Sequence, residues 1–95
     1  MQMTINAELF TWRGPSPFHF IAVPAAESQR IRSAAALVSY GWGMIPVKAQ
    51  IGETIWTTSL FAKDGVYVVP IKNLVRFGEK LTVGELVELT LTLAI

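Results

Sequence analysis

The clearest pattern in the chain is an alternation of apolar and polar positions over residues 85–93. Every second residue there is a valine or a leucine, namely Val87, Leu89, Leu91 and Leu93. The intervening positions are Leu86, Glu88, Thr90 and Thr92. Successive side chains of a β-strand point to opposite faces, so this pattern predicts a strand with one buried face.

Two strands and a helix are predicted in the first half of the chain. Residues 3–12 are rich in β-branched and aromatic side chains, and one face of that strand carries Ile5, Ala7, Leu9 and Thr11. A Gly/Pro turn at 13–17 leads to a short strand at 18–23, apolar on both faces. Pro24 suits the first residue of a helix over 25–38. Its apolar stripe is Ile31, Ala34, Ala35 and Val38.

Two hairpin signals follow a break at residues 39–43. Gly52-Glu53 separates strands predicted over 44–51 and 54–63, and a leading glycine suits a type II′ turn. Asp64-Gly65 is typical of the other favoured two-residue turn and leads into a strand over 66–69.

Prolines and a glycine suggest further boundaries. Pro46 indicates an edge position within its strand, because proline cannot donate to a ladder. Pro70 ends the strand that precedes it and lies near the start of a short helix, which runs from 71 to 77 or 78 with Gly78 as its C-terminal cap. A turn at 81–84 connects this helix to the last strand.

These elements amount to about six strands and two helices, joined mostly by short turns. The expected fold is mainly β, an antiparallel barrel or pseudo-barrel capped by helices. At 95 residues the chain is expected to form a single domain over 1–95.

Composition narrows the classes of function. Hydrophobic residues make up 52% of the chain, and charged residues make up 16%, against about 25% in typical domains. Intrinsically disordered chains combine low hydrophobicity with high net charge, so this composition excludes intrinsic disorder. A net charge of +1 does not imply attraction to nucleic acid or to an anionic membrane. Cysteine is absent, which excludes disulfides, thiol catalysis and zinc held by cysteine. No cofactor is expected.

The mean hydropathy of +0.43 is high for a small monomer. We therefore expect a homo-oligomer, most simply a homodimer that covers apolar surface. A monomer with threonine- and alanine-rich outer faces is the alternative. No stretch reaches the about 18 unbroken apolar residues of a membrane span, and residues 1–10 lack a positive region ahead of an apolar run. The expected location is the cytoplasm.

Several segments together resemble a known family. They are GWGMIPVKAQIG at 41–52, WTTSLF at 56–61, DGVY at 64–67, VPIK at 69–72 and VGE at 83–85. This pattern resembles the bacterial family called domain of unknown function 1905. The resemblance implies a small helix-capped split barrel, in the fold neighbourhood of swapped-hairpin transcription factors, and brings no catalytic residue or cofactor with it. Ala62 and Glu85 stand where relatives often have proline and aspartate.

Few residues could carry catalysis. His19 is the one histidine, and a half-exposed position on a strand explains it without a chemical role. A metal site needs three or four ligands, and with one histidine and no cysteine it would have to rely on carboxylates. No carboxylate pair is placed by local geometry to share a proton, as acid–base catalysis by two carboxylates would require. We therefore expect no catalytic residue, no metal site and no enzymatic activity.

Binding residues are easier to suggest. Trp56, Thr58 and Ser59 combine an aromatic ring with hydroxyls, which could line a pocket for a polar ligand. Threonine is also simply a good strand former. Lys72 and Arg76 are neighbours on one helical face, where like charges are unfavourable unless an anion or an acid answers them. The alternatives are that both are solvated or that they pair with Glu79 or Glu85.

The hypothesis from the sequence is a small binding module without catalytic activity. Its site lies between the strand with residues 56–59 and the helix with Lys72 and Arg76, and it recognises a small anionic or polar ligand. The alternative is a dimeric DNA-binding regulator of swapped-hairpin type, although eight scattered basic residues do not favour nucleic acid as a partner. An enzyme is the third option.

Overall fold

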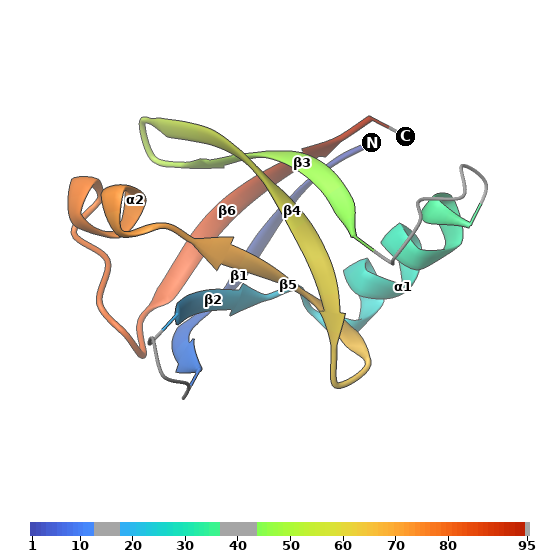
Figure 1. The fold of residues 1–95 in the computed structure, drawn as a ribbon, viewed down its shortest axis with the longest axis horizontal. Coiled ribbons are helices and arrows are strands. Elements are labelled where there is room, and N and C mark those ends of the chain that lie inside the picture. Colours follow the sequence, from blue (N-terminus) through green and yellow to red (C-terminus); the bar gives the residue numbers. More distant parts are fainter. Residues whose placement is uncertain (13–17, 37–43, 95) are drawn as a thin grey trace.

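The chain forms a closed antiparallel barrel with strand order β1-β2-β5-β4-β3-β6 and two short helices (Figure 1). The structure is a computed structural model and describes residues 1–12, 18–36 and 44–94. Its elements are β1 (Gln2–Trp12), β2 (Phe18–Ala22), α1 (Ala25–Ala35), β3 (Ile45–Ile51), β4 (Thr54–Lys63), β5 (Val66–Ile71), α2 (Asn73–Gly78) and β6 (Leu86–Leu93). The mainly-β fold predicted from the sequence is confirmed.

Both predicted hairpin turns are present. Gly52 has a positive φ of 56°, whereas Glu53 is not among the residues with a positive φ. A positive φ at the first turn residue alone is what a type II′ turn requires, so Gly52-Glu53 fits that type. Asp64 and Gly65 have φ of 52° and 84°, as a type I′ turn requires. Because a two-residue turn fixes the register of its hairpin, these two turns set the pairing of β3, β4 and β5.

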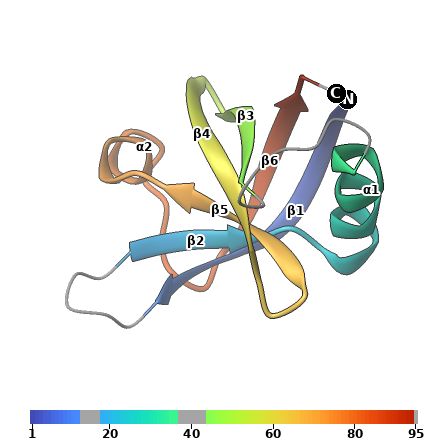
Figure 2. The same ribbon diagram turned by 45° about the vertical axis from the view of Figure 1, so that its right-hand side comes forward.

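The first and last strands close the barrel. β1 pairs with β6 from Gln2↔Thr92 to Glu8↔Leu86, and β6 pairs with β3 on its other side. The two ends of the chain therefore lie side by side (Figure 2). The alternation predicted for β6 is confirmed, since its four inward residues are buried.

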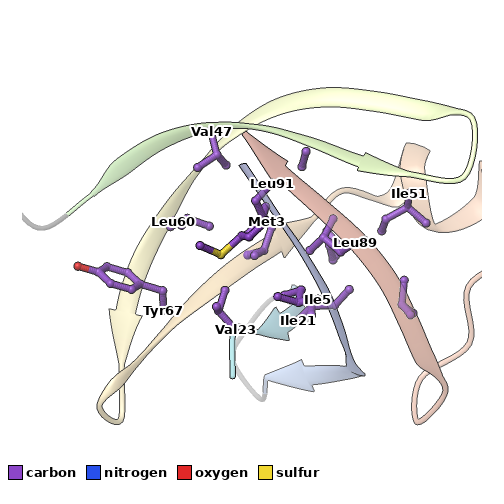
Figure 3. Packing of buried hydrophobic residues seen from close by; sticks show 14 of the residues in the cluster. Met3, Ile5, Ile21, Val23, Val47, Ile51, Leu60, Tyr67, Leu89 and Leu91 are labelled. Carbon is purple, nitrogen blue, oxygen red and sulfur yellow. The ribbon is translucent and has the colours of Figure 1, made fainter. Parts of the chain in front are cut away.

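Inward-facing aliphatic side chains fill the barrel (Figure 3). Every strand contributes to this core, for example Ile5, Ile21, Leu60, Tyr67 and Leu89. Each helix adds to it in turn, α1 with Ile31 and α2 with Val75. The helices lie on opposite sides of the barrel (Figure 1).

A buried serine joins α1 to the sheet. The Ser28 hydroxyl donates to the carbonyl of Val23 at 2.9 Å and accepts from the backbone N–H of Tyr67 at 3.0 Å. Ser28 is the one polar residue in the buried set of the described chain. Both hydrogen-bonding functions of its hydroxyl are used, which explains how a polar group is tolerated there.

The outer surface divides into two parts. The polar face consists of Gln2, Thr4, Lys48, Gln50, Thr90 and Thr92 on β1, β3 and β6. The aromatic face consists of Phe10, Trp12, Phe18, Phe20 and Phe61 on β1, β2 and β4. Phe20 pairs with Phe10 and is only 5% exposed, yet it is not part of the barrel core. Its ring is instead enclosed by the other four aromatic rings, at centroid distances of 5.5–6.3 Å.

The prolines behave differently from the prediction. Pro70 lies inside β5 rather than at its end, because its partner on β2 is Phe20 and the ladder continues to Ile71. β3 has a neighbour on each side, but its ladder with β6 stops at Val47, so Pro46 sits one residue beyond it. A proline is tolerated where no ladder bond is lost.

The helices are shorter than predicted. α2 begins at Asn73 rather than 71, since Ile71 still belongs to β5. Gly78 is the last helical residue, and the positive φ of 53° falls on Lys80 instead. α1 ends at Ala35; Val38, the turn at 13–17 and the break around Trp42 lie outside the described residues. No described helix is long and apolar enough to cross a membrane.

Candidate functional site

Pro70 interrupts the ladder between β4 and β5. Next to a two-residue turn, alternate pairs exchange both backbone hydrogen bonds, so Lys63 bonds with Val66 and Phe61 with Val68. The next such pair would join Ser59 to Pro70, which has no N–H to give. The ladder does stop after Phe61↔Val68, and β4 continues without β5 beside it.

This interruption leaves one edge of β4 unpaired. Counting from the turn at Gly52-Glu53, Ile51 and Thr54 exchange hydrogen bonds, and so do every second pair after them. The backbone N–H and C=O groups of Ile55, Thr57 and Ser59 therefore point away from β3. We call these backbone groups the open edge of β4.

The segment that leaves β5 passes next to the open edge. The Lys72 ammonium donates to the carbonyl of Thr57 at 3.4 Å. Three residues back along β4, the Thr54 hydroxyl donates to a carboxylate oxygen of Glu79 at 2.6 Å. Glu79 also lies against Gly52, where any Cβ would meet its carboxylate. These contacts place α2 beside the first half of β4 (Figure 1).

Two buried donors at this junction have no acceptor. Trp56, whose half-buried side chain packs against the core, has an indole Nε1 with no hydrogen-bond partner. The same holds for Nε of Arg76. The rest of the Arg76 guanidinium donates to the Asn73 amide oxygen at 3.4 Å and lies 4.4 Å from the ring centroid of Phe77.

The carboxylates nearby are engaged elsewhere. Glu79 accepts from Thr54, and Glu85 accepts from the backbone N–H of Thr82 at 2.6 Å. The one ion pair among the described residues joins Lys63 to Asp64. Lys72 and Arg76 therefore have no carboxylate partner within the described chain. Nor do three histidine or acidic side chains gather there as metal ligands.

The pKa of His19 is affected by the charge of Arg76. It lies half-buried on β2, opposite Ile71 at the end of β5. Burial, and then the positive charge of Arg76, lower the pKa of His19 below its ordinary value of 6.5. The junction therefore favours a neutral imidazole and holds an excess of positive charge.

The five residues selected from the sequence have different environments. Trp56 and Thr58 face the barrel interior, Ser59 faces outward, and Lys72 and Arg76 lie on the segment beside them. Thr58 also lines a shallow groove, away from α2, with Pro46, Lys48 and Thr92. The structure thus brings Lys72 to the carbonyl of Thr57, next to Trp56 along β4, and places Arg76 on the helix that follows Lys72, but it turns Thr58 and Ser59 to opposite faces of β4.

Sequence reasoning did not include His19 or the open edge in the site. A signal for the open edge was present in Pro70. A proline inside a strand marks a place where a neighbour cannot pair fully, which is the argument applied to Pro46. The approach of His19 to Arg76 depends on the pairing of β2 with β5, for which no local signal exists.

No curated protein matches the chain. The model of the family described as Domain of unknown function (DUF1905) matches residues 6–91. This match extends from β1 to β6 and includes every element that forms the junction. The segments that suggested the resemblance lie within it. The chain therefore belongs to the DUF1905 family.

Proposed function

We propose that this protein is a cytoplasmic binding module without catalytic activity, and that it recognises an anionic ligand where α2 meets the open edge of β4. The observation that carries the proposal is the pair of buried donors, Trp56 Nε1 and Arg76 Nε, which have no acceptor. A buried donor without an acceptor costs about 1–3 kcal/mol, so a ligand that supplies acceptors gains this energy on binding.

The charge distribution supports an anion over a neutral ligand. Lys72 and Arg76 lack carboxylate partners among the described residues, and Glu79 and Glu85 accept hydrogen bonds from other donors. Carboxylate and phosphate oxygens accept charge-assisted bonds, which are stronger than bonds between neutral groups. A bound oxygen would offset the positive charge that now acts on His19.

Self-association is part of the same proposal. The aromatic face exposes 42% of Trp12 and 60% of Phe18, and large aromatic side chains are enriched where proteins meet. We infer that a second copy of the chain covers this face, as the high mean hydropathy suggests.

DNA binding is less well supported. The described basic residues lie on different elements: Arg30 and Arg32 on α1, Lys48 on β3, Lys63 on β4, Lys72 just before α2, Arg76 on α2 and Lys80 after it. A duplex needs a continuous row of such charges along one face.

The single histidine provides the test. The proton on Cε1 of its ring gives one NMR signal. The pH titration of this signal yields the pKa of His19 with and without inorganic phosphate or succinate. We expect the bound anion to raise this pKa, because it offsets the charge of Arg76. Arg76→Gln should abolish the anion effect. The matched control Lys48→Gln removes the same charge from the polar face and should leave it intact.

Two outcomes would contradict the proposal. One is a titration of His19 that neither anion changes. The other is an equal response in Arg76→Gln and in the parent protein. Binding of a short DNA duplex that weakens steeply as salt rises would instead support the regulator.

A further inference from the structure

We propose that the open edge of β4 binds an extended acidic peptide, which adds to the barrel as a further strand and places a carboxylate at Lys72 and Arg76. This inference rests on the proposed function, because it names the chemical class of the anion and adds the backbone that carries it. The occupant is a segment of another protein rather than a free metabolite.

The first argument is the spacing of the unpaired groups. Ile55, Thr57 and Ser59 present three N–H and C=O sets at every second residue, which is the repeat of a β-ladder, roughly 7 Å per step. The Lys72 ammonium donates to one of these groups, the carbonyl of Thr57. An unpaired strand edge of this kind is a template for another strand, and many peptide-binding domains use it.

Pro70 keeps the edge available. Because it has no N–H, β5 cannot extend its pairing with β4 past Phe61↔Val68. Pro70 can offer Ser59 only its carbonyl, so these two residues cannot exchange both hydrogen bonds as Phe61 and Val68 do. An incoming strand, in contrast, brings its own N–H groups and can satisfy the carbonyls that β5 cannot reach.

Exposed apolar side chains lie on both β4 and α2. Ile55 is 56% exposed on β4, and α2 exposes 83% of Leu74 and 65% of Phe77. Side chains of an added strand alternate between its two faces, so those on one face can cover such residues. Backbone bonds would supply affinity, and these contacts would supply a preference for apolar residues at alternate positions.

Charge decides between an acidic peptide and a second copy of this chain. If two copies paired through their open edges, the Lys72 and Arg76 of each would approach those of the other, and neither side chain forms an ion pair with a carboxylate of the described chain. Such like-charge contacts are unfavourable at an interface. A peptide that carries glutamate or aspartate meets the same two cations with the opposite sign.

The test uses one peptide of six residues in all: a glutamate at each end and four residues of alternating valine and threonine between them. Its controls replace both glutamates by glutamine, or N-methylate one or the other set of alternate residues. Because a strand pairs through alternate residues, one N-methylated peptide loses the donors that face β4. NMR of the ¹⁵N-labelled protein follows the amides of Ile55, Thr57 and Ser59 and the ring of His19 in the same samples.

We expect the parent peptide to shift these three amides and to raise the pKa of His19. Glutamine replacement and one of the two N-methyl sets should each weaken binding by about tenfold or more. In the protein, Thr57→Pro removes an N–H that points away from β3 and should weaken peptide binding without loss of the β3–β4 ladder. If this variant does not fold, the N-methylated peptides still decide the question.

The outcomes separate the two proposals. If phosphate or succinate raises the pKa of His19 but no peptide shifts the β4 amides, the peptide inference is wrong and the anion site stands. If both N-methylated peptides bind like the parent, the partner does not add as a strand, and the inference is again wrong. If neither anion nor peptide has any effect, both proposals fail.

Discussion

The polar face and the aromatic face are built by the same barrel but follow different rules. On the polar face the hydroxyls of Thr4 and Thr90 bond across the β1–β6 pair at 3.0 Å, and the Gln2 amide donates to Thr92 at 3.2 Å. These side chains remain largely in water. On the aromatic face the rings pack against one another in tilted and edge-on arrangements and bury Phe20 outside the core.

β1 takes part in both the polar face and the aromatic face. Its first half places Gln2 and Thr4 on the polar face, and its second half places Phe10 and Trp12 on the aromatic face. The inward positions from Met3 to Leu9 are all apolar. The period of two therefore decides which residues fill the barrel, whereas the chemistry of the outward residues decides whether that part of the surface stays in water or buries itself. The aromatic face is a second, small hydrophobic cluster.

Truncation of Phe20 should give the largest effect. Phe20→Ala removes the ring that the other four enclose, and loss of a buried phenylalanine side chain costs about 3–5 kcal/mol. Thr90→Ala on the polar face should cost less than about 1 kcal/mol. Urea denaturation of both variants measures these losses, and similar values for the two would show that the aromatic face is not a packed cluster.

Self-association should depend on the aromatic face alone. Phe18→Ser removes an aromatic side chain that is 60% exposed, so the monomer should lose little stability. If Phe18 anchors the interface, the dissociation constant of the dimer should rise by about tenfold or more. Thr4→Ser is the matched change on the polar face and should have no effect. Sedimentation equilibrium that finds a monomeric parent protein would refute the role of the aromatic face.

β2, which contributes Phe18 and Phe20 to the aromatic face, also contains the one histidine, His19. This histidine makes the free energy of unfolding depend on pH. The folded state lowers the pKa of His19 through burial and the charge of Arg76. Below the unfolded pKa of about 6.5 the unfolded chain binds more protons, so the free energy of unfolding decreases as pH falls from there towards the folded pKa. Thermal denaturation between about pH 5.5 and 7.5 should show this trend, and His19→Gln should flatten it. An equal slope in both proteins would contradict it.

The smallest effect is expected for the hydroxyl pair on the polar face. A double-mutant cycle of Thr4→Val and Thr90→Val should give a coupling of about 0.5 kcal/mol, as exposed cross-strand pairs do. A coupling above about 2 kcal/mol would mean that the polar face contributes to stability through its hydrogen bonds as much as the aromatic face does through packing.

Local signals in the sequence were sufficient for the elements and the turns. Asp64-Gly65 requires positive φ at both positions, and the leucine alternation of β6 requires one buried face, so both could be predicted from a few residues. The barrel follows less directly. The strand pattern and the short turns indicated an antiparallel barrel, but the pairing of β1 with β6 joins residues about 90 positions apart, and no local signal indicated it.

The candidate site was only partly predictable, and for the same reason. The spacing of Lys72 and Arg76 placed two cations together, but the side chains around them come from other strands. Trp56 lies near them because Glu79 bonds with Thr54, and His19 because β2 pairs with β5. The aromatic face was missed because Phe18 and Phe20 were expected on a strand that is apolar on both faces, without the rings of β1 and β4 that cover them.

The seam between β1 and β6 has a consequence for synthesis on the ribosome. The hairpins on either side of β4 use neighbouring residues and can form as soon as they emerge. β1, however, is made first and finds its partner in the last strand to emerge. Its apolar face must wait without this neighbour until β6 has emerged, so the barrel cannot close, and its core stays open to misfolding and to chaperones, until all six strands have been made.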